Sequence, residues 1–163
     1  MMHSSLVMYD DDYRKLLVII QRLAQDATAK GVFLVDTNGQ MVAEAGEMQG
    51  IDATSLASLT AGNIAASSGL AKILGEEEFP THFHQGQRDN LFITLAASRI
   101  ILVVVFDERS SLGLVRLRVK KAGTQIAQVF EEIRKKAERE QSSGGSSPFS
   151  EITDDDIDNL FSE

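Results

Sequence analysis

The chain has 163 residues, the usual size of one domain, and its 43% hydrophobic and 25% charged residues match globular averages, which excludes wholesale disorder. It has no cysteine, which excludes disulfides, thiolate metal sites and cysteine nucleophiles. The net charge is −8, but residues 141–163 hold six acids and no base, so the body of the chain is nearly neutral. This distribution argues against partners that are nucleic acids or anionic membranes.

The first part of the chain predicts a helix and a hairpin. Apolar residues recur at three- and four-residue steps over 10–30, which indicates one apolar stripe on an amphipathic helix. Two short apolar runs, 32–35 and 41–43, flank the dipeptide Asn38-Gly39. Because Asn-Gly readily adopts the positive φ angles of a tight turn, these runs are expected to form a β-hairpin.

A second helix is predicted over 52–74. Asp52 or Thr54 is a suitable N-cap residue, and Gly75 stands where a helix would end. The larger side chains of this helix are expected to face the sheet, and they are Leu56, Leu59, Asn63, Leu70, Ile73 and Leu74. Its small residues form a smooth stripe at helical spacing, made of Gly62, Ala65, Ala66 and Gly69. The stripe is interpreted either as a flat partner surface or as a close fit of the helix to its own sheet.

Strands and a long helix complete the predicted fold. The runs 91–96 and 99–106 are expected to be two strands, and the second is apolar on both faces, as in a covered central strand. Residues 81–86, which follow a proline, suit a weaker edge strand. A sustained apolar stripe favours one helix over about 111–140. The fold class is therefore α+β, with an antiparallel sheet of about five strands and helices against it.

The chain ends in a segment of different composition. Residues 1–140 are predicted to form the domain, 141–148 a flexible Gly/Ser linker, and 149–163 an acidic amphipathic helix. Ile157, Leu160 and Phe161 lie at i, i+3 and i+4, behind a capping-box pattern. A helix this short is unstable alone, so we expect it to dock in a groove of a partner. A disordered solubilising tail is the alternative, but it leaves the apolar spacing unexplained.

The sequence contains no motif for catalysis or nucleotide binding. It lacks the GxxxxGK[ST] phosphate loop, the GxGxxG turn and the GxSxG elbow. His82 and His84 would point to one face of a strand, but a zinc site needs three or four ligands, so ordinary edge-strand roles are favoured. No cofactor or metal is therefore expected, and the chain is interpreted as a binding protein. Without an export signal or a membrane-spanning run, a cytoplasmic location is predicted.

A basic group stands out from the acidic background of the chain. Its members are Arg116, Arg118, Lys120 and Lys121, with Arg14 and Lys15 on the first predicted helix. Such a group can dock an acidic partner. A solvated outer face of two neighbouring helices is the favoured interpretation, because most charge runs have that role.

Three stretches of the chain resemble the roadblock/light-chain-seven family, in particular its members from bacterial gliding and polarity systems. They are IDATSLASLTAGNIAASSGLAKILGE, FDERSSLGLVRLRVKKA and SPFSEITDDDIDNLFSE. The resemblance covers nearly the whole chain, and the last stretch makes it most specific. It implies an α-β-β-α-β-β-β-α fold with helices on both faces of a five-stranded sheet. It also implies a homodimer, with the second helices side by side and the third strands paired across the two-fold axis.

The resemblance further implies a regulator that stimulates GTP hydrolysis by a small Ras-like GTPase of the MglA type. Such a regulator supplies no arginine finger but reorders the switch regions of the GTPase, which itself holds GTP and Mg²⁺. The smooth stripe would be the contact surface for the GTPase, comprising Thr54, Ser58, Gly62, Ala65, Ala66 and Gly69. The C-terminal helix would dock on the GTPase and influence its affinity or nucleotide exchange through Ile152, Ile157, Leu160 and Phe161.

The basic residues Lys15, Arg116 and Lys121 would lie on the opposite face, available to polarity scaffold proteins, with the protein enriched at a cell pole. A roadblock scaffold that binds partners without accelerating hydrolysis is the alternative function. A sensor of small ligands is a third hypothesis, but the sequence offers no convergent polar cluster for it.

Overall fold

The structure is a computed structural model that describes residues 8–143 and residue 159. Eight elements follow one another: α1 (Asp10–Asp26), β1 (Gly31–Asp36), β2 (Met41–Gly46), α2 (Ala53–Leu74), β3 (Thr81–Gln85), β4 (Asn90–Ala97), β5 (Ile100–Phe106) and α3 (Leu112–Ser143). Residues 8–130 form one compact unit that contains the whole sheet. The part of α3 from Glu131 onward belongs to a second unit, in which Arg134 forms ion pairs with Glu131 and Glu138.

The five strands form one antiparallel sheet in the order β2-β1-β5-β4-β3. β5 is central and is buried at every position, as its uninterrupted apolar sequence predicts. β3 lies at one edge and β2 at the other. The predicted element order, hairpin, central strand and edge strand are all confirmed.

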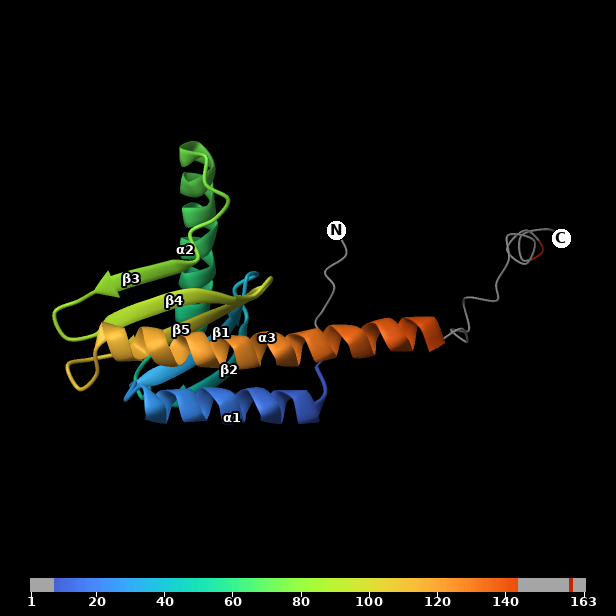
Figure 1. Ribbon diagram of the computed structural model, residues 1–163, viewed down its shortest axis with the longest axis horizontal. Helices are drawn as coiled ribbons and strands as arrows, with labels where there is room; N and C mark the ends of the chain where they lie inside the picture. Colours follow the sequence, from blue (N-terminus) through green and yellow to red (C-terminus); the bar gives the residue numbers. More distant parts are fainter. Residues whose placement is uncertain (1–7, 144–158, 160–163) are drawn as a thin grey trace. The chain divides into compact units, whose positions relative to one another are not determined.

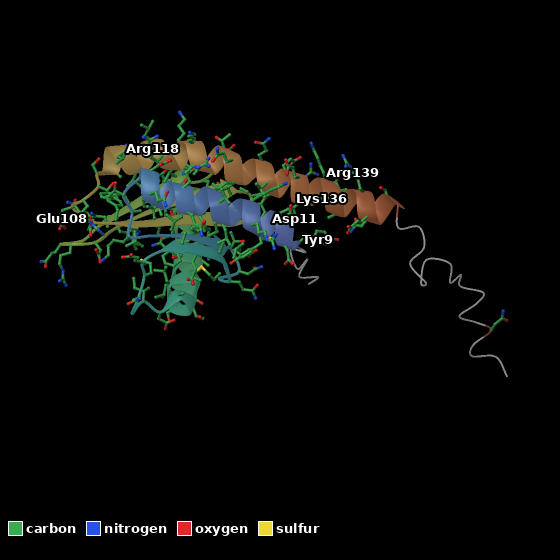
Figure 2. The ribbon with its side chains drawn as sticks, turned by 90° about the horizontal axis from the view of Figure 1, so that it is seen from below. Tyr9, Asp11, Glu108, Arg118, Lys136 and Arg139 are labelled. Atoms are coloured by element: carbon green, nitrogen blue, oxygen red, sulfur yellow. The ribbon has the colours of Figure 1, made fainter. Side chains whose placement is uncertain are left out.

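Helices cover both faces of the sheet. Figure 2 shows α1 and the first part of α3 on one side of the strands and α2 on the other. Side chains alternate along the strands, so Phe33 and Val103 pack in one core cluster with Ala57 and Ile64 of α2. The intervening strand residues are buried on the other side, where α1 and α3 lie; they include Val32, Leu34, Leu102 and Val104.

The ends of α2 are set by its capping residues, as predicted. Asp52 is the N-cap: its Oδ1 accepts a hydrogen bond from the Ser55 backbone N–H at 3.1 Å, and its Oδ2 accepts one from Ser55 Oγ at 2.6 Å. These bonds favour the ionised carboxylate and lower the pKa of Asp52. At the other end, Gly75 has a φ of +76°, the left-handed conformation that closes helices.

Two other helices end away from their predicted limits. α1 stops at Asp26 instead of continuing to residue 30, and Thr28 then takes a φ of +49° as the chain turns into β1. α3 continues to Ser143, so the first three residues of the predicted linker are helical. The expected docking helix over 149–163 lies outside the described residues, apart from residue 159.

Candidate functional site

α2 packs on the sheet through small side chains. Ala57, Thr60, Ala61 and Ile64 are its buried residues up to position 64, and only Ala71 is buried in the ten residues that follow. Figure 1 shows the second half of α2 extending past the edge of the sheet. Because alanines form most of the contact, the helix lies close to the strands and leaves its larger side chains for other directions.

The prediction that the large residues of α2 face the sheet is therefore wrong for most of them. Leu56 packs partly buried against the core, and Asn63 is half-buried. The other four are exposed by 58–81%: Leu59, Leu70, Ile73 and Leu74. The reason is the helical phase, which the buried Ala57, Ala61 and Ile64 determine at steps of four and three residues.

These four exposed residues, Leu59, Leu70, Ile73 and Leu74, form the large-residue face of α2. The exposed Leu59, Leu70 and Ile73 share one side of the helix with Ala66, at spacings of seven, four and three residues. A contiguous exposed apolar surface is a candidate interaction site. The sequence pattern assigned these residues to the sheet instead, because they share one side of the helix, as the residues of a sheet-facing side do.

The predicted smooth stripe forms a second outward face, the small-residue face. All six of its residues lie at least partly open to solvent, and Ala66 lies at the border with the large-residue face: Thr54, Ser58, Gly62, Ala65, Ala66 and Gly69. Apart from the adjoining residues and backbone of α2 itself, a Cβ atom built on Gly62 or Gly69 would meet no atom of the described residues within 4 Å. Contact with the sheet of the same chain therefore does not explain these small residues, whereas it does explain Ala57 and Ala61.

The edge strand β3 lies beside α2. His82 connects the two elements: its Nδ1 lies 3.5 Å from Ser67 Oγ of α2, and its Nε2 lies 3.0 Å from the carbonyl oxygen of Phe79. On the opposite face of the strand, Phe83 is 38% exposed and stacks on Phe106 with 6.1 Å between ring centroids. Among residues 8–143 no group of three His, Asp or Glu side chains is placed to hold a metal ion.

The basic residues predicted to bind a scaffold lie on the other side of the sheet. Lys15 of α1 and Arg116 and Lys121 of α3 are exposed there. A small hollow between the two helices is lined by Arg118 and Lys121 together with residues of α1. Arg118, labelled in Figure 2, is half-buried, and its buried Nε has no hydrogen-bond partner among the described residues. This surface is therefore separate from both outward faces of α2.

The four apolar residues predicted to anchor the C-terminal helix, Ile152, Ile157, Leu160 and Phe161, lie outside the described residues. Of the helices that are described, none combines the length and the apolar character needed to cross a lipid bilayer.

Comparisons with known proteins relate this arrangement to one family. The family model of the Roadblock/LC7 domain matches residues 15–106. Among solved structures, MglB of Myxococcus xanthus is 56% identical, with a TM-score of 0.74 over 78% of this chain and 96% of that one. The gliding protein MglB of Thermus thermophilus is 34% identical, with a TM-score of 0.73 over 80% of this chain and 99% of that one.

A third structure, described as MglB with a tetrameric arrangement, is 33% identical and has a TM-score of 0.74 over 81% of this chain and 99% of that one. A roadblock/LC7 domain from Streptomyces avermitilis is 16% identical with a TM-score of 0.55, which relates the fold alone. No curated protein matched the chain.

Proposed function

Since the chain belongs to the roadblock/LC7 family and is a homologue of MglB, we propose that it is a homodimeric GTPase-activating protein for a small Ras-like GTPase of the MglA type. The observation that carries this proposal is the pair of outward faces on α2, one with large and one with small side chains. Each face suits a different partner. The family resemblance implies that these partners are a second copy of the chain and the GTPase.

The large-residue face pairs with its counterpart on a second copy of the chain. Leu70 and Ile73, 58% and 81% exposed, would be covered by the same residues across a two-fold axis. β3 is an edge strand next to α2, so a second β3 can extend the sheet at the same interface. Removal of this apolar surface from water is the main driving force for the association.

The small-residue face then contacts the GTPase. Ala65 has no side-chain atom beyond Cβ, and Gly69 has no side chain. The backbone of a partner can therefore approach α2 closely at these positions. No candidate nucleophile or acid–base pair stands out on this face, so we propose that activation works by positioning. The regulator reorders the switch regions so that the GTPase's own residues align on the γ-phosphate and the attacking water.

The remaining predicted surfaces have supporting roles in this proposal. The C-terminal helix, with Ile152, Ile157, Leu160 and Phe161 as anchors, docks on the GTPase and adjusts its affinity or nucleotide exchange. Lys15, Arg116 and Lys121 bind polarity scaffold proteins and bring the protein to a cell pole. The protein works in the cytoplasm in cell polarity and gliding motility, and it needs no cofactor of its own.

Single-turnover GTP hydrolysis by the cognate GTPase tests this function. The assay compares the GTPase alone, with the full chain, and with the full chain carrying Leu160→Glu and Phe161→Glu. An acceleration of about 10-fold or more, equal to ~1.4 kcal/mol of barrier, establishes the activating role. If the tail variant no longer accelerates hydrolysis, the tail contributes to the activation of hydrolysis. If the variant still accelerates hydrolysis, the tail acts only on affinity or nucleotide exchange. Binding without acceleration supports the alternative, a scaffold without catalytic effect.

A further inference from the structure

β2 is an edge strand whose outer side has open backbone groups. Its register with β1 places Ala43 and Ala45 opposite Leu34 and Val32. The Glu47 N–H bonds to the Lys30 carbonyl, which fixes the alternation of the ladder, so the N–H and C=O of Glu44 point away from β1. Within residues 8–143 no strand pairs with this outer side.

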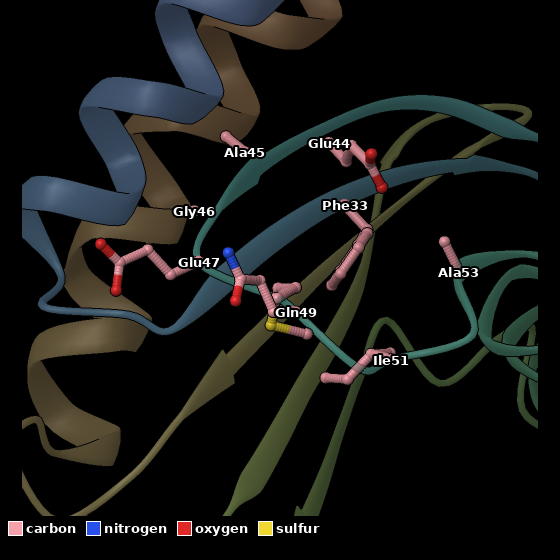
Figure 3. A pocket seen from close by; sticks show the side chains of 9 residues that line it. Phe33, Glu44, Ala45, Gly46, Glu47, Gln49, Ile51 and Ala53 are labelled. Atoms are coloured by element: carbon pink, nitrogen blue, oxygen red, sulfur yellow. The ribbon is translucent and has the colours of Figure 1, made fainter.

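A groove of about 750 Å³ runs beside this edge, on the face of the sheet that also carries α2. Phe33 lies at its base, and Ile51 and Ala53 form apolar walls (Figure 3). Met48 also lines the groove. Ile51 is 41% exposed. Met48 is partly buried and packs over Gly31, and its flexible side chain can adjust to an apolar group that enters the groove.

The charges along the groove have one sign. Glu44 and Glu47 are both exposed, and the nine lining residues include no base. Two cations lie near Glu47, and both have acidic partners: Arg109 is paired with Asp107 at 3.0 Å, and Lys30 is paired with Asp89 at 3.1 Å. The floor of the groove is therefore apolar, and its rim is acidic.

This edge carries few of the features that usually protect sheet edges from pairing. Residues 41–46 contain neither Pro nor Lys, Glu44 is their one charged residue, and the ladder irregularity lies at the turn end, between Leu34 and Val35. We propose that the β2 edge binds an extended peptide segment of a partner protein by strand addition. On the side that faces the groove, the segment carries alternating apolar and basic side chains. The apolar side chains enter the groove, the basic side chains pair with Glu44, and the backbone bonds to the open groups of β2.

This binding surface is centred on β2 and the loop after it, and it adjoins the proposed GTPase contact only at Ala53, the residue before Thr54. The test uses three labelled peptides with blocked ends and the full chain. The first is Lys-Thr-Val-Thr-Lys-Thr-Val; the second replaces each Lys with Glu; the third is the first with alternate amides N-methylated. Fluorescence anisotropy measures their affinities.

We expect the Lys peptide to bind at least about 10-fold more tightly than either the Glu peptide or the N-methylated peptide. Glu44→Lys should reverse the preference between the Lys and Glu peptides. Glu77→Gln, which changes an exposed acid outside the groove, should leave all affinities unchanged. Equal affinity for the Lys and Glu peptides, or an unchanged preference in Glu44→Lys, would overturn the proposal.

Hydrogen exchange on the unmutated protein provides a test that does not depend on the folding of a variant. The Lys peptide should slow the exchange of the Glu44 and Gly46 amides at least several-fold and leave β3 amides unchanged. If the peptide binds but slows exchange only elsewhere, strand addition at β2 is wrong.

Discussion

The two outward faces of α2 are both open to solvent, but they differ in bulk. The large-residue face offers Leu59, Leu70, Ile73 and Leu74, whereas the small-residue face offers little beyond Cβ at most positions. A large apolar side chain gains stability from burial in a complementary surface, and a small one instead allows close backbone approach. Both faces are therefore candidate interaction surfaces because they are exposed, and their side-chain volumes distinguish the kinds of partner that they suit.

The largest effect is expected from bulk and charge on the small-residue face. Ala65→Arg with Gly69→Arg should reduce GTP hydrolysis to the rate of the GTPase alone, because two long cations prevent close approach. The dimer should persist, because neither residue belongs to the large-residue face. Hydrolysis rates and sedimentation equilibrium measure the two outcomes. As a control, Gln21→Arg with Gln128→Arg adds the same charge on α1 and α3. Full activation by the α2 double variant would refute the assignment.

Charge on the large-residue face should instead separate the two copies. Leu70→Glu with Ile73→Glu is expected to weaken dimerisation by at least about 100-fold, because two interface anchors then carry buried charges. Sedimentation equilibrium measures the dissociation constant. Leu117→Glu, at a residue 62% exposed on α3, is the matched control and should leave the dimer intact. A dimer that tolerates the charges on α2 would place the interface elsewhere.

Two isoleucines on α2 allow a direct comparison of its inner and outer sides. Ile64 is 7% exposed and packs in the core, whereas Ile73 is 81% exposed. In a Leu70→Glu background, at a concentration where sedimentation equilibrium finds that variant monomeric, Ile64→Ala should lower the free energy of unfolding by about 2–5 kcal/mol. Ile73→Ala should change it by no more than about 0.5 kcal/mol. Urea unfolding measures both, and similar losses at the two sites would show that the face assignment is wrong.

The smallest effect concerns the N-cap that positions the start of both faces. Asp52→Asn should lower Tm by about 2–4 °C at neutral pH, because a neutral amide then stands in place of the charged carboxylate that accepts the hydrogen bonds of Ser55. The folded pKa of Asp52 is lowered, so the stabilising effect is present above its ordinary value of 3.8 and is lost as pH falls through the lower folded value. Thermal unfolding should therefore show the two proteins converging below about pH 4. A constant difference down to about pH 2 would assign the effect to packing.

Most of the fold was predictable because local signals agree with one another. Asn38-Gly39 predicted the hairpin, Asp52 and Gly75 predicted the limits of α2, and the unbroken apolar run of β5 predicted a central strand. The end of α1 was less predictable, because Thr28 takes a left-handed φ that residues of its type rarely adopt.

The site was only partly predictable from the sequence. Exposure of the six small residues agrees with the interpretation of a partner surface, although their role remains a proposal. The phase of α2 was not predictable, because its alanines suit both burial and exposure and its leucines suggested the wrong side. The acidic groove beside β2 depends on the contact of the loop 47–52 with the sheet, which leaves no periodic signal in the sequence.

The absence of cysteine permits a direct test of the claim that the two faces of α2 serve different partners. Ile73→Cys and Ala65→Cys each introduce a single thiol, and the rate of thiol labelling is measured on the dimer, with and without the GTP-loaded GTPase. The account predicts that the thiol at position 73 is protected before the GTPase is added. It also predicts that the thiol at position 65 reacts freely in the dimer and slows several-fold in the complex. Protection of position 65 by dimerisation alone, or of position 73 only by the GTPase, would contradict the assignment of partners to faces.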